Sequence, residues 1–289
     1  MTNFLYWWQH LPEHMNPVIV QFGSFRLQYY GLMYIVAFAI TYALATYRLR
    51  REERFHIDAE QLQGLMTAMI LGLIIGARLG YVLFYNLPYY LHHPLEIILP
   101  FKFSGGFRFT GITGMSYHGG LIGVVVATVF FVHKYRLDFF NTADLIVPCI
   151  PLGYTFGRLG NFINGELFGR VTTLPIGMHF PLAPDEGLLL RHPSQLYEAF
   201  FEGIVLFIFL WTIKKRVTTR GAMLAIYLMG YGLVRFFIEY VRQPDPQLVP
   251  HDVFIFLSLS MGQLLCIAMI LTGALLLVYL KKMEKQRTQ

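Results

Sequence analysis

Hydrophobic positions in this chain fall into long runs that are separated by short polar segments. Seven runs predict membrane-crossing helices, and they cover residues 29–47, 62–85, 117–133, 142–161, 195–213, 221–241 and 255–280. Their lengths are close to the roughly 20 residues that a helix needs to cross the hydrocarbon core of a bilayer. Pro148 and Pro151 lie inside the fourth run and predict a distortion of that helix.

The runs are not those of a membrane β-barrel, because apolar and polar positions do not alternate in segments such as LIGVVVATVFFV. Composition agrees with membrane helices: 55% of the 289 residues are hydrophobic and 14% are charged, whereas about 25% are charged in soluble domains. The mean hydropathy is +0.50. We therefore expect an all-α, polytopic integral membrane protein with a single membrane domain over residues 1–289.

The first 15 residues, MTNFLYWWQHLPEHM, lack the basic region and the apolar core of a removable signal peptide. Trp7 and Trp8 are instead expected to anchor the chain at the membrane interface. Cys149 and Cys266 lie inside apolar runs, which predicts buried, inert thiols and no disulfide.

The basic residues predict the orientation in the membrane, because cytoplasmic loops carry an excess of Lys and Arg. One of the two alternating sets of loops holds 14 of the 23 basic residues, namely Arg48, Arg50, Arg51, Arg54, Lys134, Arg136, Lys214, Lys215, Arg216, Arg220, Lys281, Lys282, Lys285 and Arg287. This set is predicted to be cytoplasmic, so that the N-terminus lies outside and the C-terminus inside. The isoelectric point near 9.2 then reflects topology and anionic lipid, and no nucleic-acid partner is expected.

Two connections on the predicted external side are too long to be simple turns. Residues 86–116 are expected to form an external arm segment, and residues 162–194 an external cap segment. The polar residues of the spans gather at this same end: Tyr30, Arg78, His118, Arg158, Asn161, Asn164, Glu166, His192, Gln195, Glu198, Glu202, Arg235 and Glu239. An ionisable group inside a span costs about 2.5–3.5 kcal/mol, so the concentration at one end predicts a site that opens toward the outer leaflet.

Several of these residues also have simpler structural explanations. Arg235 and Glu239 stand four apart on one helical face and can neutralise each other. Arg78 can serve as a partner for helix-end carbonyls or extend to the interface. Glu198 and Glu202 are either an inward-facing carboxylate pair or the solvated start of the fifth span, and we expect the second.

The residue types at this end suit an anionic ligand. Arg158 and Arg235, on two different helices and with Asn161 nearby, can bind a phosphate through bidentate hydrogen bonds, and a phospholipid head group is the expected anion in an outer leaflet. His118 lies in GMSYHGG, where glycines permit close approach of a ligand, and is a candidate general base. The sequence has no Cys/His cluster with metal spacing, its carboxylates are scattered, and it has no G-x-S-x-G, H-E-x-x-H or G-x-x-x-x-G-K-(S/T) motif, so no metal and no cofactor are expected.

Two other classes of function fit the sequence less well. A transporter or flippase of an anionic lipid or solute usually binds its cargo near the membrane midplane between inverted repeats, and neither feature is visible here. An intramembrane serine hydrolase that uses Ser116 and His118 has poor geometry, because the two residues are only two apart.

The segment GRLGNFINGELFGR, residues 157–170, closely resembles the signature of the bacterial prolipoprotein diacylglyceryl transferases. Other stretches that resemble this family follow in the same order as in the family: QYYGLMY (28–34), GARLGYVLFYN (76–86), GMSYHGGLIG (114–123), RHPSQLYEAFFEG (191–203), GYGLVRFFIEYVRQPD (230–245) and SMGQLL (260–265). The resemblance therefore extends from the first predicted span to the last.

The resemblance implies an enzyme of the bacterial inner membrane with its active site toward the periplasmic leaflet. Such an enzyme transfers the diacylglyceryl group of phosphatidylglycerol to the lipobox cysteine of a prolipoprotein signal peptide, and it releases glycerol phosphate. It also implies residue roles: essential arginines Arg158 and Arg235, a supporting set of Asn161, Glu166, Gly169 and Glu239, and a functional tyrosine and histidine, Tyr30 and His118.

Overall fold

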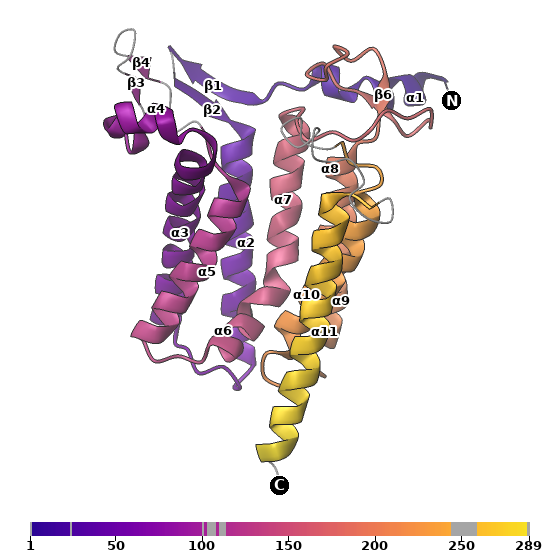
Figure 1. Ribbon diagram of the computed structural model, residues 1–289. Helices are drawn as coiled ribbons and strands as arrows, with labels where there is room; N and C mark the ends of the chain where they lie inside the picture. Colours follow the sequence, from indigo (N-terminus) through magenta and orange to yellow (C-terminus); the bar gives the residue numbers. More distant parts are fainter. Residues whose placement is uncertain are drawn as a thin grey trace. The chain divides into compact units, whose positions relative to one another are not determined.

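The computed structural model describes residues 2–23, 25–99, 101–102, 108–109, 114–243 and 259–287. The described chain is mostly helical (Figure 1). Its helices are α1 (Thr2–Gln9), η1 (Leu11–His14), α2 (Tyr29–Arg51), α3 (Ala59–Tyr85), α4 (Leu87–His92), η2 (Pro94–Ile97), α5 (Tyr117–Lys134), α6 (Phe139–Ile146), η3 (Val147–Cys149), α7 (Ile150–Ile163), α8 (Ser194–Tyr197), η4 (Glu198–Val205), α9 (Leu206–Ile213), α10 (Ala222–Ile238) and α11 (Met261–Arg287). Its strands form the pairs β1 (Val18–Phe22) with β2 (Phe25–Gln28), β3 (Phe101–Lys102) with β4 (Arg108–Phe109), and β5 (Met178–His179) with β6 (Leu190–Arg191).

Five helices of the described chain are long and apolar enough to cross a membrane, which agrees with the expected all-α, polytopic class. They are Tyr29–Arg51, Ala59–Tyr85, Tyr117–Lys134, Ser194–Ile213 and Met261–Gln286. The expected sixth span is a shorter apolar helix, α10, of 17 residues. The expected start of the seventh span, at residues 255–258, lies outside the described residues.

The fourth predicted span is not one continuous α-helix. A 3-10 turn, η3, separates α6 from α7, and Pro148 lies within it. Pro151 stands in the first turn of α7, where its missing N–H has no helical partner to lose. The distortion expected from the two prolines is therefore present.

The chain forms two compact units. The first consists of Met1–Gln21, Arg26–Tyr47 and Ala143–Gln289, and the second of Phe22–Phe25 and Arg48–Thr142. In the second unit α3 and α5 lie side by side (Figure 1). Gly80 and Gly119 make this contact close, because a Cβ on Gly80 would lie 2.7 Å from the Gly119 Cα. Small residues at a helix contact are typical of membrane bundles.

Arg78 ties the predicted arm segment to α3 within the second unit. Its guanidinium donates to the carbonyl oxygens of Ile97 (2.9 Å) and Gly114 (3.3 Å) and lies over the Tyr90 ring at 4.9 Å. This arrangement matches the structural alternative given for Arg78. Residues 100, 103–107 and 110–113 of the arm segment lie outside the described residues.

Asp144 fixes the start of α10 in the first unit. Its buried carboxylate accepts hydrogen bonds from the backbone N–H groups of Gly221 (2.7 Å), Met223 (3.1 Å) and Leu224 (3.3 Å). A carboxylate at a helix N-terminus satisfies amide groups that have no helical partner. The interaction holds α6 and α10 together at one end of the unit.

The predicted cap segment packs against the N-terminal helix. The Trp8 indole donates to the Ile176 carbonyl (3.0 Å), and the rings of His10 and His179 stack at 4.6 Å. The indole N–H of Trp8 is thus bound within the protein, and the expected role of Trp8 as an interfacial anchor stays a prediction. Trp7 is exposed, as a residue at a membrane interface would be.

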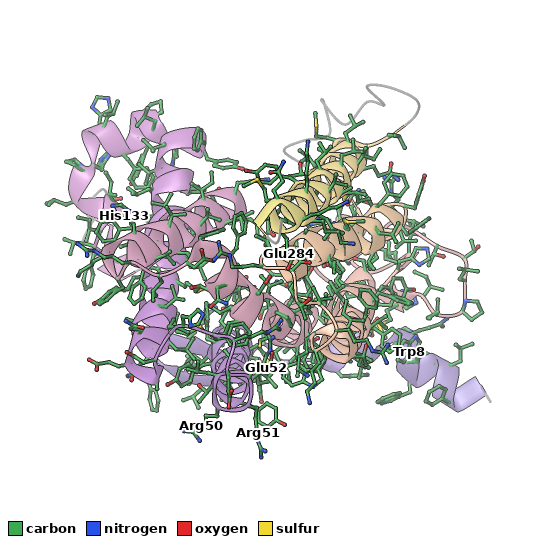
Figure 2. The ribbon with its side chains drawn as sticks, turned by 90° about the horizontal axis from the view of Figure 1, so that it is seen from below. Trp8, Arg50, Arg51, Glu52, His133 and Glu284 are labelled. Carbon is green, nitrogen blue, oxygen red and sulfur yellow. The ribbon has the colours of Figure 1, made fainter. Side chains whose placement is uncertain are left out.

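The C-terminal end of α2 carries a cluster of basic residues that splits into two kinds. Arg48 is fully buried and pairs with Glu52 at 2.8 Å. Arg50 and Arg51 are exposed, and Figure 2 shows their side chains pointing away from the ribbon. Partial burial would raise the pKa of the Glu52 carboxyl, but the neighbouring arginines outweigh this and hold it below its usual range.

Candidate active site

Arg158 lies near the end of α7 and has one partner on another helix. Its Nε donates to the Tyr154 hydroxyl at 2.6 Å, and its Nη1 donates to Oδ1 of Asn161 at 3.2 Å. These two partners stand four residues before and three after it on the same helix. The third partner is the carboxylate of Glu198 on η4, whose Oε2 lies 2.8 Å from the Arg158 Nε.

Arg235 occupies the corresponding position near the end of α10. Its Nη2 donates to Oε2 of Glu239 at 3.0 Å, so the pair expected from their spacing is formed. Its Nη1 donates to Oε1 of Glu198 at 3.1 Å and lies 3.6 Å from Glu202. Mutual neutralisation with Glu239 is therefore not the only role of this arginine.

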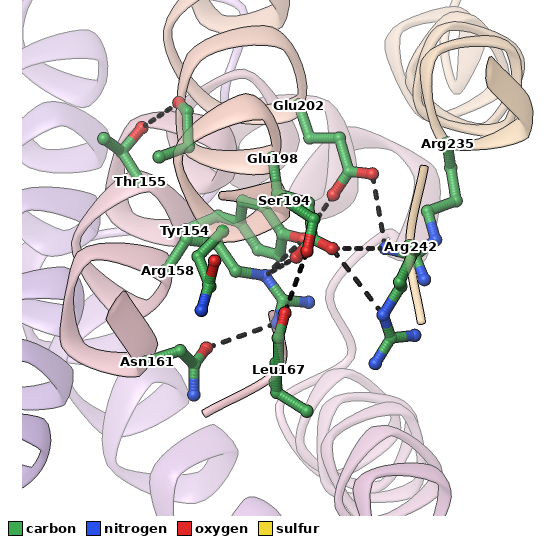
Figure 3. A network of polar contacts seen from close by, with 12 residues as sticks. Tyr154, Thr155, Arg158, Asn161, Leu167, Ser194, Glu198, Glu202, Arg235 and Arg242 are labelled. Atoms are coloured by element: carbon green, nitrogen blue, oxygen red, sulfur yellow. Dashed lines mark hydrogen bonds and ion pairs between the residues drawn. The ribbon is translucent and has the colours of Figure 1, made fainter. Parts of the chain in front are cut away.

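Glu198 and Glu202 are buried inside the first unit, which corrects the expectation that they form a solvated helix start. Glu198 is 0% exposed and Glu202 is 1% exposed. Both belong to η4, a π-helix, in which residues four apart share one face. The hydroxyl of Tyr154 donates to Glu202, and the network is drawn in Figure 3. Buried carboxylates are stable only when paired, and here arginines surround them.

A third arginine, Arg242, joins the same carboxylate. It follows α10, and its Nε lies 3.7 Å from Oε1 of Glu198. Three cationic side chains from two separate segments therefore meet at one buried anion. Neither Arg242 nor Tyr154 is among the site residues predicted from the sequence. The signal that could have revealed this centre is the carboxylate pair in YEAFFEG, since two buried acids in an apolar span require basic partners.

Asn161 links Arg158 to the loop that follows α7. Its Nδ2 donates to Oε1 of Glu166 at 2.8 Å. The backbone carbonyl of Glu166 in turn accepts a hydrogen bond from Nε2 of Gln195 at 2.6 Å. Asn161 and Glu166, which the resemblance assigns to the substrate site, are thus joined in one chain of hydrogen bonds with Arg158.

Gly169 lies where three segments of the chain approach closely. Its N–H donates to the His192 carbonyl at 2.8 Å, and it pairs with Arg242 in an antiparallel bridge. A Cβ on Gly169 would lie 2.7 Å from the His192 Cβ and still closer to the Val241 carbonyl oxygen. Because Gly169 has no side chain, the segment that carries Arg242 can pack closely against it.

His192, whose carbonyl accepts the Gly169 N–H, is itself partly buried. This burial lowers the pKa of the His192 imidazole.

Tyr30 lies in the first turn of α2, beside α7. A Cβ on Gly160 would lie 3.4 Å from the Tyr30 ring, which places the ring against α7. The hydroxyl of Tyr30 is 3.0 Å from that of Tyr34. Of the predicted site residues, the first unit brings together Tyr30, Arg158, Asn161, Glu166, Gly169, Arg235 and Glu239 in one region.

His118 belongs to the second unit, where it is the second residue of α5 and is exposed. Its ring meets that of Tyr117 edge-on, with centroids 5.7 Å apart. Ser116 is buried and caps α5 by accepting the Gly119 N–H at 3.2 Å. This capping role argues against Ser116 as the nucleophile of a hydrolase.

The arrangement in the first unit is suited to an anion. The side chains of Arg158 and Arg235 remain 15% and 12% exposed, while their guanidinium groups are oriented by buried partners. Guanidinium groups held in this way bind phosphate through paired hydrogen bonds. Within the described residues, no group of three or more His, Cys, Asp or Glu side chains could hold a metal ion.

Comparison with known proteins places the chain in a family. A family model described as prolipoprotein diacylglyceryl transferase matches residues 17–279. A phosphatidylglycerol–prolipoprotein diacylglyceryl transferase of Chlorobaculum tepidum is 53% identical over 283 residues, which cover 98% of this chain and 96% of that protein. A protein of the same name from Bordetella parapertussis is 46% identical, covering 90% and 93%, and one from Francisella tularensis is 45% identical, covering 92% and 93%. The chain belongs to the prolipoprotein diacylglyceryl transferase family.

Proposed function

We propose that this protein transfers the diacylglyceryl group of phosphatidylglycerol to the lipobox cysteine of prolipoproteins, the first step of lipoprotein maturation. The family model spans most of the chain, and the similar proteins carry the name of this transferase. The observation that carries the proposal is the arginine pair: Arg158 and Arg235, from two different helices of an apolar chain, converge on one buried carboxylate.

The proposed reaction explains why two fixed arginines are needed. The cysteine sulfur attacks the glycerol carbon that bears the phosphate, a carbon–sulfur bond forms, and the carbon–oxygen bond breaks. The electron pair of the broken bond stays on the departing glycerol phosphate, while the thiol proton leaves with a base. Negative charge therefore grows on the phosphate, and donors that are already oriented stabilise the transition state more than the bound substrate.

The thiol must lose its proton, because a free cysteine near pKa 8.5 is mostly protonated at neutral pH. His118, exposed at the start of α5, is proposed as the base. Arg158 and Arg235 are proposed to bind the phosphate. Tyr30 is proposed as a catalytic residue, and the remaining members of the substrate site are Asn161, Glu166, Gly169 and Glu239.

The proposed location is the bacterial inner membrane, with seven spans, an external N-terminus and a cytoplasmic C-terminus. The two spans added to the five long helices are α10 and the broken α6–α7 segment. A 17-residue helix is within the range that crosses a bilayer core. The uneven distribution of Lys and Arg between the loops supports this orientation, which puts the arginine pair on the periplasmic side together with the arm segment 86–116 and the cap segment 162–194.

The test is a reaction with purified protein in detergent, phosphatidylglycerol and a short peptide with a lipobox cysteine. Mass spectrometry should find a diacylglyceryl thioether on the peptide, together with released glycerol phosphate in equal amount. A peptide with serine in place of the cysteine is the matched control and should remain unmodified.

A folded sample that binds phosphatidylglycerol but forms neither product would contradict the proposed reaction. In that case, movement of the lipid between leaflets of a vesicle would be measured next, since the arginine pair would still provide an anion site.

A further inference from the structure

Glu198 is the residue through which Arg158 and Arg235 contact the same group. Each arginine has partners on its own helix: Arg158 contacts Tyr154 and Asn161, and Arg235 contacts Glu239. Asn161 and Glu239 orient a guanidinium only relative to the helix that carries it. Tyr154 also donates to Glu202, which lies 3.6 Å from Nη1 of Arg235, but this second route between the arginines passes through two side chains, whereas Glu198 contacts both arginines directly.

The two oxygens of the Glu198 carboxylate divide the arginines between them. Oε2 lies 2.8 Å from the Nε of Arg158, and Oε1 lies 3.1 Å from Nη1 of Arg235 and 3.7 Å from the Nε of Arg242. The contact with Arg158 is an ion pair, since the Nε–H is donated to Tyr154, whereas the contact with Arg235 is also a hydrogen bond. Because both oxygens belong to one rigid planar carboxylate, the two contacts together limit the separation of the guanidinium groups. Figure 3 shows the arginines approaching the carboxylate from different sides.

Because Glu198 is buried, water does not replace the arginines as partners of its carboxylate. Glu198 is 0% exposed, whereas the side chains of Arg158 and Arg235 keep 15% and 12% of their surface accessible. The carboxylate is therefore more deeply buried than the two arginine side chains that it contacts, which keep some surface accessible. Carboxylates in this position act as supports that hold functional groups in a productive geometry.

We propose that Glu198 is a positioning residue, which sets the spacing and orientation of Arg158 and Arg235 for the phosphate of the lipid without touching the substrate itself. This inference rests on the proposed transferase function. It predicts that loss of the bridge affects the rate of the chemical step more than the binding of the lipid. Misplacement of a reactive group by about 1 Å can lower a rate by about 100-fold.

Three variants test the proposal. Glu198→Gln keeps the shape of the side chain but loses its charge, and Glu198→Asp keeps the charge but shortens the side chain by one carbon. Asp144→Asn is the matched control, because it alters another buried carboxylate of the same unit that binds the opposite end of α10. It tests whether weakening the attachment of α10 is enough to explain a loss of rate.

Each variant is measured in three ways: its thermal unfolding midpoint, its dissociation constant for phosphatidylglycerol in detergent micelles, and its turnover divided by the fraction of molecules that bind the lipid. Division by the binding fraction removes the effect of unfolded protein. We expect Glu198→Gln to lower turnover about 100-fold and to change the dissociation constant less than about fivefold. Glu198→Asp should have a higher turnover than Glu198→Gln, within about tenfold of the wild type, because the charge is kept. Asp144→Asn should have a lower unfolding midpoint and wild-type turnover.

Wild-type turnover per binding molecule in Glu198→Gln would overturn the proposal, as would an equal loss of turnover in Asp144→Asn. If Glu198→Gln does not fold, Glu198→Asp decides: a reduced turnover at unchanged affinity supports the positioning role, and wild-type turnover refutes it. A wild-type protein that forms no thioether would refute the transferase function and this inference with it. If the wild type is active and Glu198→Gln has the same turnover, the positioning role alone is refuted and the transferase function stands.

Discussion

Replacement of Gly169 by alanine is expected to destabilise the protein through backbone crowding. The φ angle of Gly169 is not in the left-handed region, so alanine can adopt the local conformation and only the space is at issue. A new Cβ would lie 2.7 Å from the His192 Cβ and 2.8 Å from the His192 carbonyl oxygen, whereas real Cβ contacts essentially never fall below 3.0 Å. The Val241 carbonyl is closer still, and backbone groups cannot rotate away as a side chain can.

The loss of stability in Gly169→Ala can be estimated from the backbone segments that must separate to make room for the new Cβ. Separation of the segments lengthens the hydrogen bonds from Gly169 N–H to the His192 carbonyl and from Arg170 N–H to the Val241 carbonyl, both 2.8 Å. Loss of each contributes about 0.5–1.5 kcal/mol, and overpacking costs about 1–3 kcal/mol. The expected destabilisation is about 3 kcal/mol, which lowers the unfolding midpoint of a chain of this size by roughly 6 °C or more.

The assay is thermal unfolding of the purified variant in detergent, combined with its transferase rate. Gly31→Ala is the matched control, since a Cβ at this position of α2 meets no atom within 4 Å and alanine is the better helix former. The rate of Gly169→Ala should fall with stability, because Arg242 lies on the displaced segment. An unfolding midpoint within about 1 °C of the wild type, together with full activity, would refute the reasoning.

Three further predictions concern ionisable residues. Arg158→Lys should lower turnover about 100-fold in the thioether assay, because an ammonium keeps the charge but not the paired hydrogen bonds, and retained turnover would mean that another group binds the phosphate. His118→Gln should lower turnover about 100-fold or more near neutral pH, with recovery at high pH where the thiol ionises unaided, and a rate close to the wild type would eliminate His118 as the base. His192 predicts a pH dependence of stability: burial lowers the pKa of its imidazole, so the unfolded chain binds more protons below about pH 6.5 and stability falls as the pH drops from 7 toward 5. His192→Gln should flatten this part of the curve of unfolding midpoint against pH, and an unchanged slope would contradict it.

Interactions between residues close in sequence were predictable because helix geometry alone brings them together. The four-residue spacing of Arg235 and Glu239 predicts their contact, and the three-residue spacing of Arg158 and Asn161 is consistent with theirs. The distortion of the fourth span follows in the same way from Pro148, which can neither donate a backbone hydrogen bond nor continue an α-helix.

Interactions between distant segments were not predictable in this way. The direction in which Glu198 points depends on the π-helix and on the packing of η4 against α7 and α10. The partner of the Trp8 indole is likewise not evident from the sequence, because the indole donates to the carbonyl of Ile176, 168 residues further along the chain. Sequence pattern identifies a residue as polar or aromatic without specifying what lies opposite.

The sequence by itself determined the membrane class and the approximate positions of the five long apolar helices, since a helix that crosses lipid needs a long apolar run. It also predicted an anionic ligand from the arginines. The resemblance carried by residues 157–170 also identified the family, which the comparisons confirm. Only the tertiary structure decided that Glu198 is buried and shared by Arg158 and Arg235. The physical reason is that a buried charge is stable only with partners, and these partners come from helices far apart in sequence, whose contact the folded chain alone creates.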